Sequence, residues 1–525
     1  MSARFVPLKS RKVFAISLTG IIICLTAMMC KGPSNDDFAL IEKGFINPPH
    51  EAAPRVWWHW MNGNISKEGI SADLEWMKRV GLGGFQNFDA ALATPQIVDK
   101  RLVYMTPEWK EAFLHATKLA DSLGLEMAIA GSPGWSESGG PWVKPEQAMK
   151  KFVWTETRVE GGKPFNGTLP KPPSTTGAFQ NLSMASRYSM AGGSPAPIPE
   201  YYADAAVVAY RLPETDISLN ELKPLVTSSG GRFNLASLTD GDLGTSTLLP
   251  HYKAGENSWI QFAFSEPVTI HALTIVGGGN PGTFGFGADA TSRTLEAGDD
   301  GKTFTRVTDI VTGGVNQKTL TFDPVTARYF RFTWETPQAS PFAGQDLGDL
   351  GEMFGINAAM LRAPQGTQVA ELVLHTVNRI HRFEEKAAFA TATDLYTALT
   401  PAIDSKDAVK KDEVINLTSM MKADGSLEWT PPAGKWAIIR LGYSLTGHQN
   451  SPASPEATGL EVDKLSAEHV RSYFTNYLDQ YKDATGGLMG EKGLQYVITD
   501  SWEAGTQNWT DNMMAEFLAR RGYDM

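Results

Sequence analysis

Glu503 is a carboxylate whose neighbours suit it to acid catalysis. It follows an apolar run, residues 496–498, and stands three residues after Asp500 and next to Trp502. An adjacent indole can exclude water from a carboxyl group and raise its pKa, as a general acid at neutral pH requires. Cleavage of a glycosidic bond needs such an acid beside the leaving oxygen and a second carboxylate for water or covalent attack. Glu503 is therefore the candidate catalytic acid.

Polar and aromatic residues also follow three other short apolar runs, at 56–60, 83–88 and 127–130. In a parallel barrel the carboxyl ends of all strands open on one face, which holds the active site. Loops are polar in any protein, so one such position says little, but four together favour a shared site. The expected substrate-binding residues are Trp58, His59, Asn62, Asn87, Trp135, Glu137, Asp500 and Trp502.

Helices alternate with these runs. Ser66 and Thr106 are predicted N-caps, and Gly124 is the predicted end of the second helix. Helical spacing of apolar residues returns after Ser466, and residues 510–521 are predicted to form a last helix. Strand–helix alternation of this length predicts parallel βα units. We expect an α/β fold: a (β/α)8 TIM-type barrel, truncated after about four βα units and interrupted by β-sandwich insertions.

The alternation stops near residue 150, and short β segments with Gly and Pro turns follow until about residue 443. Residues 216–365 resemble a galactose-binding-like, discoidin-type sandwich. The expected organisation is a signal peptide at 1–30, the first part of the barrel at 45–150, a β region at 151–215, the sandwich at 216–365, a second β region at 366–445 and a truncated continuation of the barrel at 446–525.

The N-terminus is typical of an export signal. Four basic residues within the first 12 precede an apolar run, residues 13–29, which ends at Cys30 and Lys31. Cys30 suggests lipid attachment, although the preceding residues 27–29 (AMM) suit a lipobox poorly. Simple secretion and an uncleaved anchor are alternatives. We expect export to the periplasm, to the outer membrane as a lipoprotein, or to the exterior.

Composition excludes other classes of protein. The chain of 525 residues is 42% hydrophobic with a formal net charge of −11, so a globular, acidic protein is expected and nucleic acid is an unsuitable partner. Both cysteines, Cys24 and Cys30, lie in the N-terminal segment, which leaves none for a disulfide or thiolate metal site in the remainder. The 14 tryptophans fit a carbohydrate partner, and no obligate protein partner is indicated.

Five motifs together resemble glycoside hydrolase family 106. They are WWHWMNGN at 57–64, GGFQNFDA at 83–90, GSPGWSESGGPWV at 131–143, PEATGLEVDK at 455–464 and TDSWEAGTQNWT at 499–510. The resemblance implies hydrolysis of terminal α-L-rhamnosyl residues with inversion, a requirement for calcium, and Glu503 as the general acid. The general base is expected beyond Met525, so this chain alone is expected to be inactive.

Two places could supply the oxygen ligands that calcium prefers. One is the expected active face, with Glu461 and Asp463 from the loop 446–464, and with Asn87 and Glu137. The other is the turn that holds Asp240 and Asp242, where a simple Asp-Gly turn is an equal alternative.

Two other functions stay open. A carbohydrate-binding surface protein with a vestigial barrel would fit the inserted sandwich. A retaining β-glycosidase would fit an acid at the end of a fourth strand.

Overall fold

The computed structural model describes residues 35–92, 94–182, 199–251, 256–277, 292–312, 314–336, 366–392, 394–396, 398–405, 407–499 and 501–525. The predicted signal peptide with Cys30, and also Asp500, lie outside the described residues. Within the described part of the chain, none of the helices combines the length and apolar character that crossing a bilayer requires.

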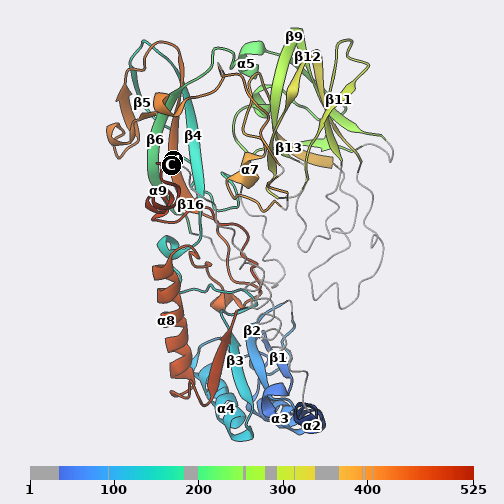
Figure 1. Cartoon of the computed structure of the whole chain (residues 1–525), viewed down its shortest axis with the longest axis vertical. Coiled ribbons are helices and arrows are strands. Elements are labelled where there is room, and N and C mark those ends of the chain that lie inside the picture. Colours follow the sequence, from blue (N-terminus) through green and yellow to red (C-terminus); the bar gives the residue numbers. More distant parts are fainter. Residues whose placement is uncertain are drawn as a thin grey trace, which may run out of the picture.

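A four-stranded parallel sheet with helices on one face forms the lower part of the molecule (Figure 1). Its strands lie in the order β1 (Arg55–Met61), β2 (Gly84–Ala90), β3 (Glu126–Ala130) and β17 (Leu494–Ile498). The helices are α3 (Lys67–Arg79), α4 (Pro107–Leu123) and α8 (Ala467–Ala484), and α2 (Asn35–Ile46) precedes β1. Within the described residues this sheet is open rather than closed, so the barrel stays a prediction.

The predicted helix starts are confirmed. The hydroxyl groups of Ser66 and Thr106 accept hydrogen bonds from the backbone N–H groups of Gly69 and Trp109, and Gly124 ends α4 in a left-handed conformation. Ser466 likewise caps α8. The last helix, α9 (Met513–Arg521), begins three residues later than predicted. Capping depends on local contacts, which is why the sequence pattern locates these ends well.

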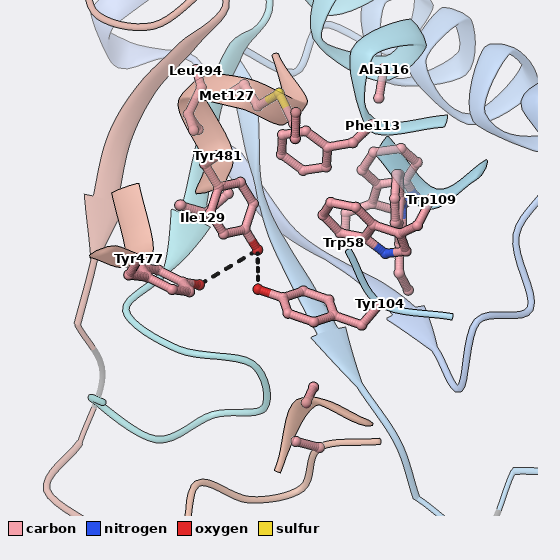
Figure 2. Packing of buried hydrophobic residues seen from close by; sticks show 14 of the residues in the cluster. Trp58, Tyr104, Trp109, Phe113, Ala116, Met127, Ile129, Tyr477, Tyr481 and Leu494 are labelled. Carbon is pink, nitrogen blue, oxygen red and sulfur yellow. Dashed lines mark hydrogen bonds between the residues drawn. The ribbon is translucent and has the colours of Figure 1, made fainter. Parts of the chain in front are cut away.

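The core between the sheet and the helices is rich in aromatic residues (Figure 2). Trp109 and Phe113 of α4 stack at 5.0 Å between ring centroids, and Trp60 meets both edge-on. The hydroxyl groups of Tyr477 and Tyr104 hydrogen-bond to that of Tyr481, so the phenols are satisfied although they are buried. This core includes residues of all four parallel strands and so fixes the positions of their carboxyl ends.

The described residues between β3 and α8 form three antiparallel sheets (Figure 1). One has the order β14 (Ile415–Asn416), β6 (Tyr202–Arg211), β16 (Lys435–Leu445) and β4 (Lys150–Glu160). A small one pairs β15 (Ser426–Trp429) with β5 (Phe165–Thr168). The long register of β4 with β16, from Lys150↔Leu445 to Glu160↔Lys435, brings the two ends of the inserted region side by side above the parallel sheet.

The third sheet has seven strands and its own buried core. Its strands are β7 (Leu225–Ser228), β8 (Thr247–Pro250), β9 (Ser258–Gly277), β10 (Arg293–Gly298), β11 (Thr305–Asp309), β12 (Gln317–Trp334) and β13 (Gly366–His375), with the short helices α5 (Leu219–Leu222) before it and α7 (Phe383–Lys386) after it. β13 pairs with β9 and β8, so the sheet extends past the expected range 216–365. Strands that pair in this sheet lie far apart in the sequence. The local sequence pattern therefore did not show that β13 belongs to it.

Candidate active site

The two faces of β1 have different environments. Side chains alternate along a strand, so Trp58 and Trp60 point to one face and Trp57 and His59 to the other. Trp58 is 9% exposed, and its indole N–H donates to Asp73 Oδ2 of α3 at 2.9 Å. Trp58 therefore belongs to the core under the helices, and the expectation that it binds substrate is corrected.

Asn87 shares the environment of Trp58. The two residues are register partners in β1 and β2, and Asn87 is 2% exposed. Its side-chain amide lies 3.5 Å from the backbone oxygen of Trp58. Because it faces the helices, Asn87 is not placed to touch substrate or to join the active-face carboxylates around calcium.

His59 lies on the opposite face and meets the loop after β3. Its ring stacks on Phe88 at 4.9 Å, and the indole N–H of Trp135 donates to His59 Nε2 at 3.1 Å. Burial lowers the pKa of His59. A neutral ring that accepts at Nε2 carries its proton on Nδ1. The structure thus brings His59 and Trp135 together, as the sequence predicted for residues of one site.

Asn62 links loops instead of facing open space. Its Oδ1 accepts from Arg101 Nη1 at 3.3 Å, and its Nδ2 donates to the backbone oxygen of Thr94 at 3.0 Å. Arg101 also pairs with Glu456 of the loop 446–464. Both the oxygen and the nitrogen of its side-chain amide are hydrogen-bonded to neighbouring loops. We therefore expect Asn62 to hold these loops in place rather than to bind substrate.

The loops 131–143 and 446–464 are bonded tightly to one another. The buried amide of Asn450 donates to the backbone oxygens of Pro133 and Ala457 and accepts from Gly459 N. The backbone of Ser451 accepts from Trp135 N at 3.0 Å. Gly139 has a φ of +118°, and a Cβ there would lie 2.8 Å from Asn450 Cβ, so only glycine fits this crossing.

Glu137, Glu461, Lys464 and Trp502 lie in one cluster. Lys464 Nζ and Ser138 Oγ each donate to Glu461 Oε2 at 2.6 Å, and Lys464 Nζ lies 5.4 Å from the ring centroid of Trp502. Burial raises the pKa of the half-buried Glu137, the nearby Lys464 opposes that shift, and Glu461 adds to it. The cluster thus combines two carboxyl groups, a lysine and an indole.

Asp463 is fully buried and surrounded by donors. It accepts from Thr510 Oγ1 at 2.8 Å, from Leu465 N at 3.0 Å and from Gln507 Nε2, with Lys150 Nζ at 3.5 Å. Two lysines set these carboxylates apart: Lys150 lies next to Asp463, and Lys464 is paired with Glu461. Their positive charges oppose a calcium ion at these two positions, so the active face suits calcium less well than the sequence suggests.

Glu503 lies in an exposed turn after β17. Ser501 Oγ donates to its Oε1 at 2.8 Å, and the indole N–H of Trp502 donates to the backbone oxygen of Gly505 at 2.5 Å. Trp502 is 52% exposed and Glu503 is exposed as well. The expectation that Trp502 shields Glu503 from water is therefore wrong, because the indole is hydrogen-bonded to Gly505 within the same turn and leaves Glu503 exposed.

The turn of Asp240 and Asp242 lies in the seven-stranded-sheet region, apart from this cluster. Asp242 accepts from Asn181, Gly244 N and Thr245. Burial raises the pKa of Glu371 to about 8, and the neighbouring carboxyl groups of Asp240 and Asp242 add to the shift. Among the described residues, no set of three or more His, Cys, Asp or Glu side chains is already arranged to hold a metal. The carboxyl oxygens gathered in this turn are nevertheless ligands of the kind that calcium prefers.

Two residues of the cluster, Lys464 and Ser138, were not predicted. Lys464 and Ser138 lie inside quoted motifs, but lysine and serine carry no distinctive spacing there. Asp89, at the end of β2, accepts from the indole N–H of Trp109 at 2.8 Å, and burial raises its pKa to about 7. The sequence pattern placed Asp89 among the polar residues at the strand ends, but the fold directs it toward α4 and away from the cluster.

Comparisons with known proteins place the chain among glycoside hydrolases. A family model described as alpha-L-rhamnosidase matches residues 46–525. The structure of a rhamnosidase from Novosphingobium sp. PP1Y has 41% sequence identity and a TM-score of 0.76, over 92% of this chain and 41% of that one. A Formosa agariphila protein whose name places it among the beta-glucuronidases is 25% identical over 486 residues, 92% of this chain and 26% of its own length. The chain therefore spans about a quarter of that relative and about two fifths of the rhamnosidase.

Proposed function

Because the chain belongs to the α-L-rhamnosidase family of glycoside hydrolases, we propose that the protein releases terminal α-L-rhamnose from glycosides or polysaccharides, with inversion. The observation that supports this best is the cluster of Glu137, Glu461, Lys464 and Trp502 next to the Glu503 turn. Carboxyl groups beside an aromatic ring are the groups that glycoside hydrolysis uses for proton transfer and for stacking on a sugar.

We assign the general acid to Glu503. In the proposed step its carboxyl group protonates the glycosidic oxygen as the bond from that oxygen to the anomeric carbon breaks. Water attacks the opposite face of the sugar and gives its proton to a second carboxylate. Exposure of Glu503 leaves its carboxyl group accessible to a bound glycoside, and the hydrogen bond from Ser501 holds one of its oxygens.

The test is the substitution Glu503→Gln in a form of the protein that hydrolyses α-L-rhamnosides. A natural α-L-rhamnoside has a poor leaving group that needs the proton, so its kcat/KM should fall by roughly two to four decades. An aryl rhamnoside with an acidic phenol needs little protonation and should be affected far less. The matched control is Glu428→Gln on β15, an exposed glutamate outside the site, which should leave both rates unchanged. Near-normal hydrolysis of the natural glycoside by Glu503→Gln would contradict the assignment.

A retaining β-glycosidase is the second candidate, because one relative carries a beta-glucuronidase name. The two candidates differ in the substrate that they cleave and in whether the released sugar keeps the anomeric configuration of that substrate. Proton NMR of the reaction with an aryl α-L-rhamnoside and, separately, with an aryl β-glucuronide identifies the substrate and whether configuration is inverted.

Export and calcium are further proposals. The basic and apolar N-terminal residues support export, with Cys30 as a lipid-attachment site if the chain is a lipoprotein. For calcium we propose the turn of Asp240 and Asp242 together with Glu371, since carboxyl oxygens are the ligands that this ion prefers. Bound there, calcium would stabilise the turn and take no part in the reaction.

A further inference from the structure

The segment that follows Glu503, residues 504–510, is held from three sides. Gln507 accepts from Lys464 N at 3.1 Å and donates to Asp463, which ties the segment to the loop 446–464. The ring of Trp509 stacks on Phe152 of β4 at 5.4 Å. The third side is the turn that follows α7.

Two backbone oxygens of the α7 turn accept hydrogen bonds from this segment. Thr506 Oγ1 donates to Phe389 O at 2.8 Å, and Asn508 Nδ2 donates to Ala387 O at 2.9 Å. Ala388, between these acceptors, has a φ of +59°, a conformation that is costly for a residue with a Cβ. The strained residue thus lies between the two carbonyl groups that hold the segment.

The α7 turn is itself anchored to the seven-stranded sheet. Glu384 is 1% exposed and accepts from Thr319 N at 3.2 Å and Thr319 Oγ1 at 2.7 Å on β12. Arg382 N donates to Thr319 O at 2.7 Å. The side chain of Phe389 is 3% exposed and packs edge-on against Phe179 at 4.8 Å. Because buried side chains fix the α7 turn, it can restrict the movement of the segment 504–510 that is hydrogen-bonded to it.

A short path leads from this turn to Glu503. Thr506 follows Gly505, whose backbone oxygen accepts from the indole of Trp502. A shift at Thr506 is therefore passed to Trp502 and to the adjacent carboxyl group. Asn508 adds a second tie, because its Oδ1 also accepts from Phe152 N at 2.8 Å.

We propose that Thr506 and Asn508 are positioning residues, through which the α7 turn of the inserted seven-stranded sheet orients the Glu503 turn for proton transfer. The inserted sheet thereby contributes to catalysis, whether or not it binds sugar. The inference rests on the proposed role of Glu503 as the general acid.

The test uses variants that break only the bonds to the α7 turn. Thr506→Val keeps the shape but lacks the hydroxyl group, and Asn508→Asp keeps an acceptor for Phe152 N but lacks the donor to Ala387 O. Hydrogen exchange followed by mass spectrometry should show faster exchange for peptides covering residues 501–510 in both variants. With a natural rhamnoside, kcat should fall roughly ten- to a hundredfold with KM little changed, because small misplacements of a reacting group are costly.

Two controls separate positioning from general destabilisation. Thr506→Ser retains the hydroxyl group and should restore both exchange and kcat. Thr326→Val removes the 2.8 Å hydroxyl pair with Thr269 elsewhere on the seven-stranded sheet and should change neither. Unchanged exchange and unchanged kcat in Thr506→Val and Asn508→Asp would overturn the proposal.

The failure of the proposed function is distinguishable. If Glu503→Gln hydrolyses the natural glycoside normally, the assignment of the acid fails and the catalytic part of this inference fails with it. Faster hydrogen exchange in Thr506→Val would then still show that the bonds to the α7 turn stabilise residues 501–510. Unchanged exchange would exclude that stabilising role as well.

Discussion

Asp89 is a carboxyl group almost entirely withdrawn from water, at 5% exposure, between the sheet and α4. Its bond with Trp109 and the charge of Arg101 lower its pKa, but burial outweighs both and raises it to about 7. A folded-state pKa above the usual value means that the folded protein binds the proton more tightly than the unfolded chain. The stabilisation from protonated Asp89 is complete below its usual pKa and is lost as the pH rises through about 7.

Asp89→Asn should therefore flatten the pH dependence of stability. The variant keeps an oxygen that can accept from Trp109 but has no proton to lose. Between about pH 4 and 7 the wild-type protein should lose on the order of a few kcal/mol that the variant retains. Denaturant unfolding at a series of pH values measures this difference, with Asp479→Asn on the exposed face of α8 as control. Identical slopes for wild type and Asp89→Asn would contradict the prediction.

At the scale of elements, two Asp turns near the seven-stranded sheet invite comparison. In the first, Asp242 accepts from Gly244 N and Thr245 Oγ1, and the carboxyl groups of Asp240 and Glu371 lie close by. In the second, Asp300 accepts from the backbone N–H groups of Lys302 and Thr303. Both turns satisfy their backbone donors, but the first also places two aspartates beside the buried Glu371.

Calcium should raise the melting temperature of the protein and chelation should lower it, because an ion bound only by the folded state stabilises it by mass action. Differential scanning calorimetry with calcium and with EDTA measures the shift. Asp240→Asn should remove the calcium response, whereas Asp300→Asn should keep it. A melting temperature that does not respond to calcium in the wild-type protein would refute the site.

At the scale of the whole molecule, the parallel sheet leaves apolar side chains exposed on β17. Tyr496, Val497 and Ile498 are 51%, 37% and 40% exposed, and Trp57 of β1, at the opposite edge, is 59% exposed. Parallel sheets in folded proteins are normally covered on both faces, and exposed apolar edges favour association.

The chain should accordingly self-associate as its concentration rises. Size-exclusion chromatography with light scattering measures the mass at several concentrations. Val497→Lys places a charge on the edge strand and should reduce association without unfolding the sheet, since charged residues on edges oppose strand pairing. A monomeric mass at every concentration, together with a cooperative melt, would show that the exposed side chains of β17 and β1 do not cause self-association.

The sequence by itself determined the features that depend on neighbours along the chain. Ser66, Thr106 and Gly124 mark helix ends through contacts within four residues, so their patterns predicted α3 and α4 correctly. The motifs around His59 and Trp135 located two residues that do meet, because His59 lies near the carboxyl end of β1 and Trp135 follows β3, and these two strand ends lie at one edge of the parallel sheet.

Only the tertiary structure decided which side chains face that edge and what they touch. Trp58 and His59 are adjacent in the sequence, yet strand alternation sends Trp58 under α3 and His59 to the other face. Asp463 resembled a metal ligand until the fold brought Lys150 and Thr510 to it from distant segments. The link from the α7 turn to Thr506 spans 117 positions. Such contacts depend on packing between segments far apart in the chain, and no local pattern of residues encodes them.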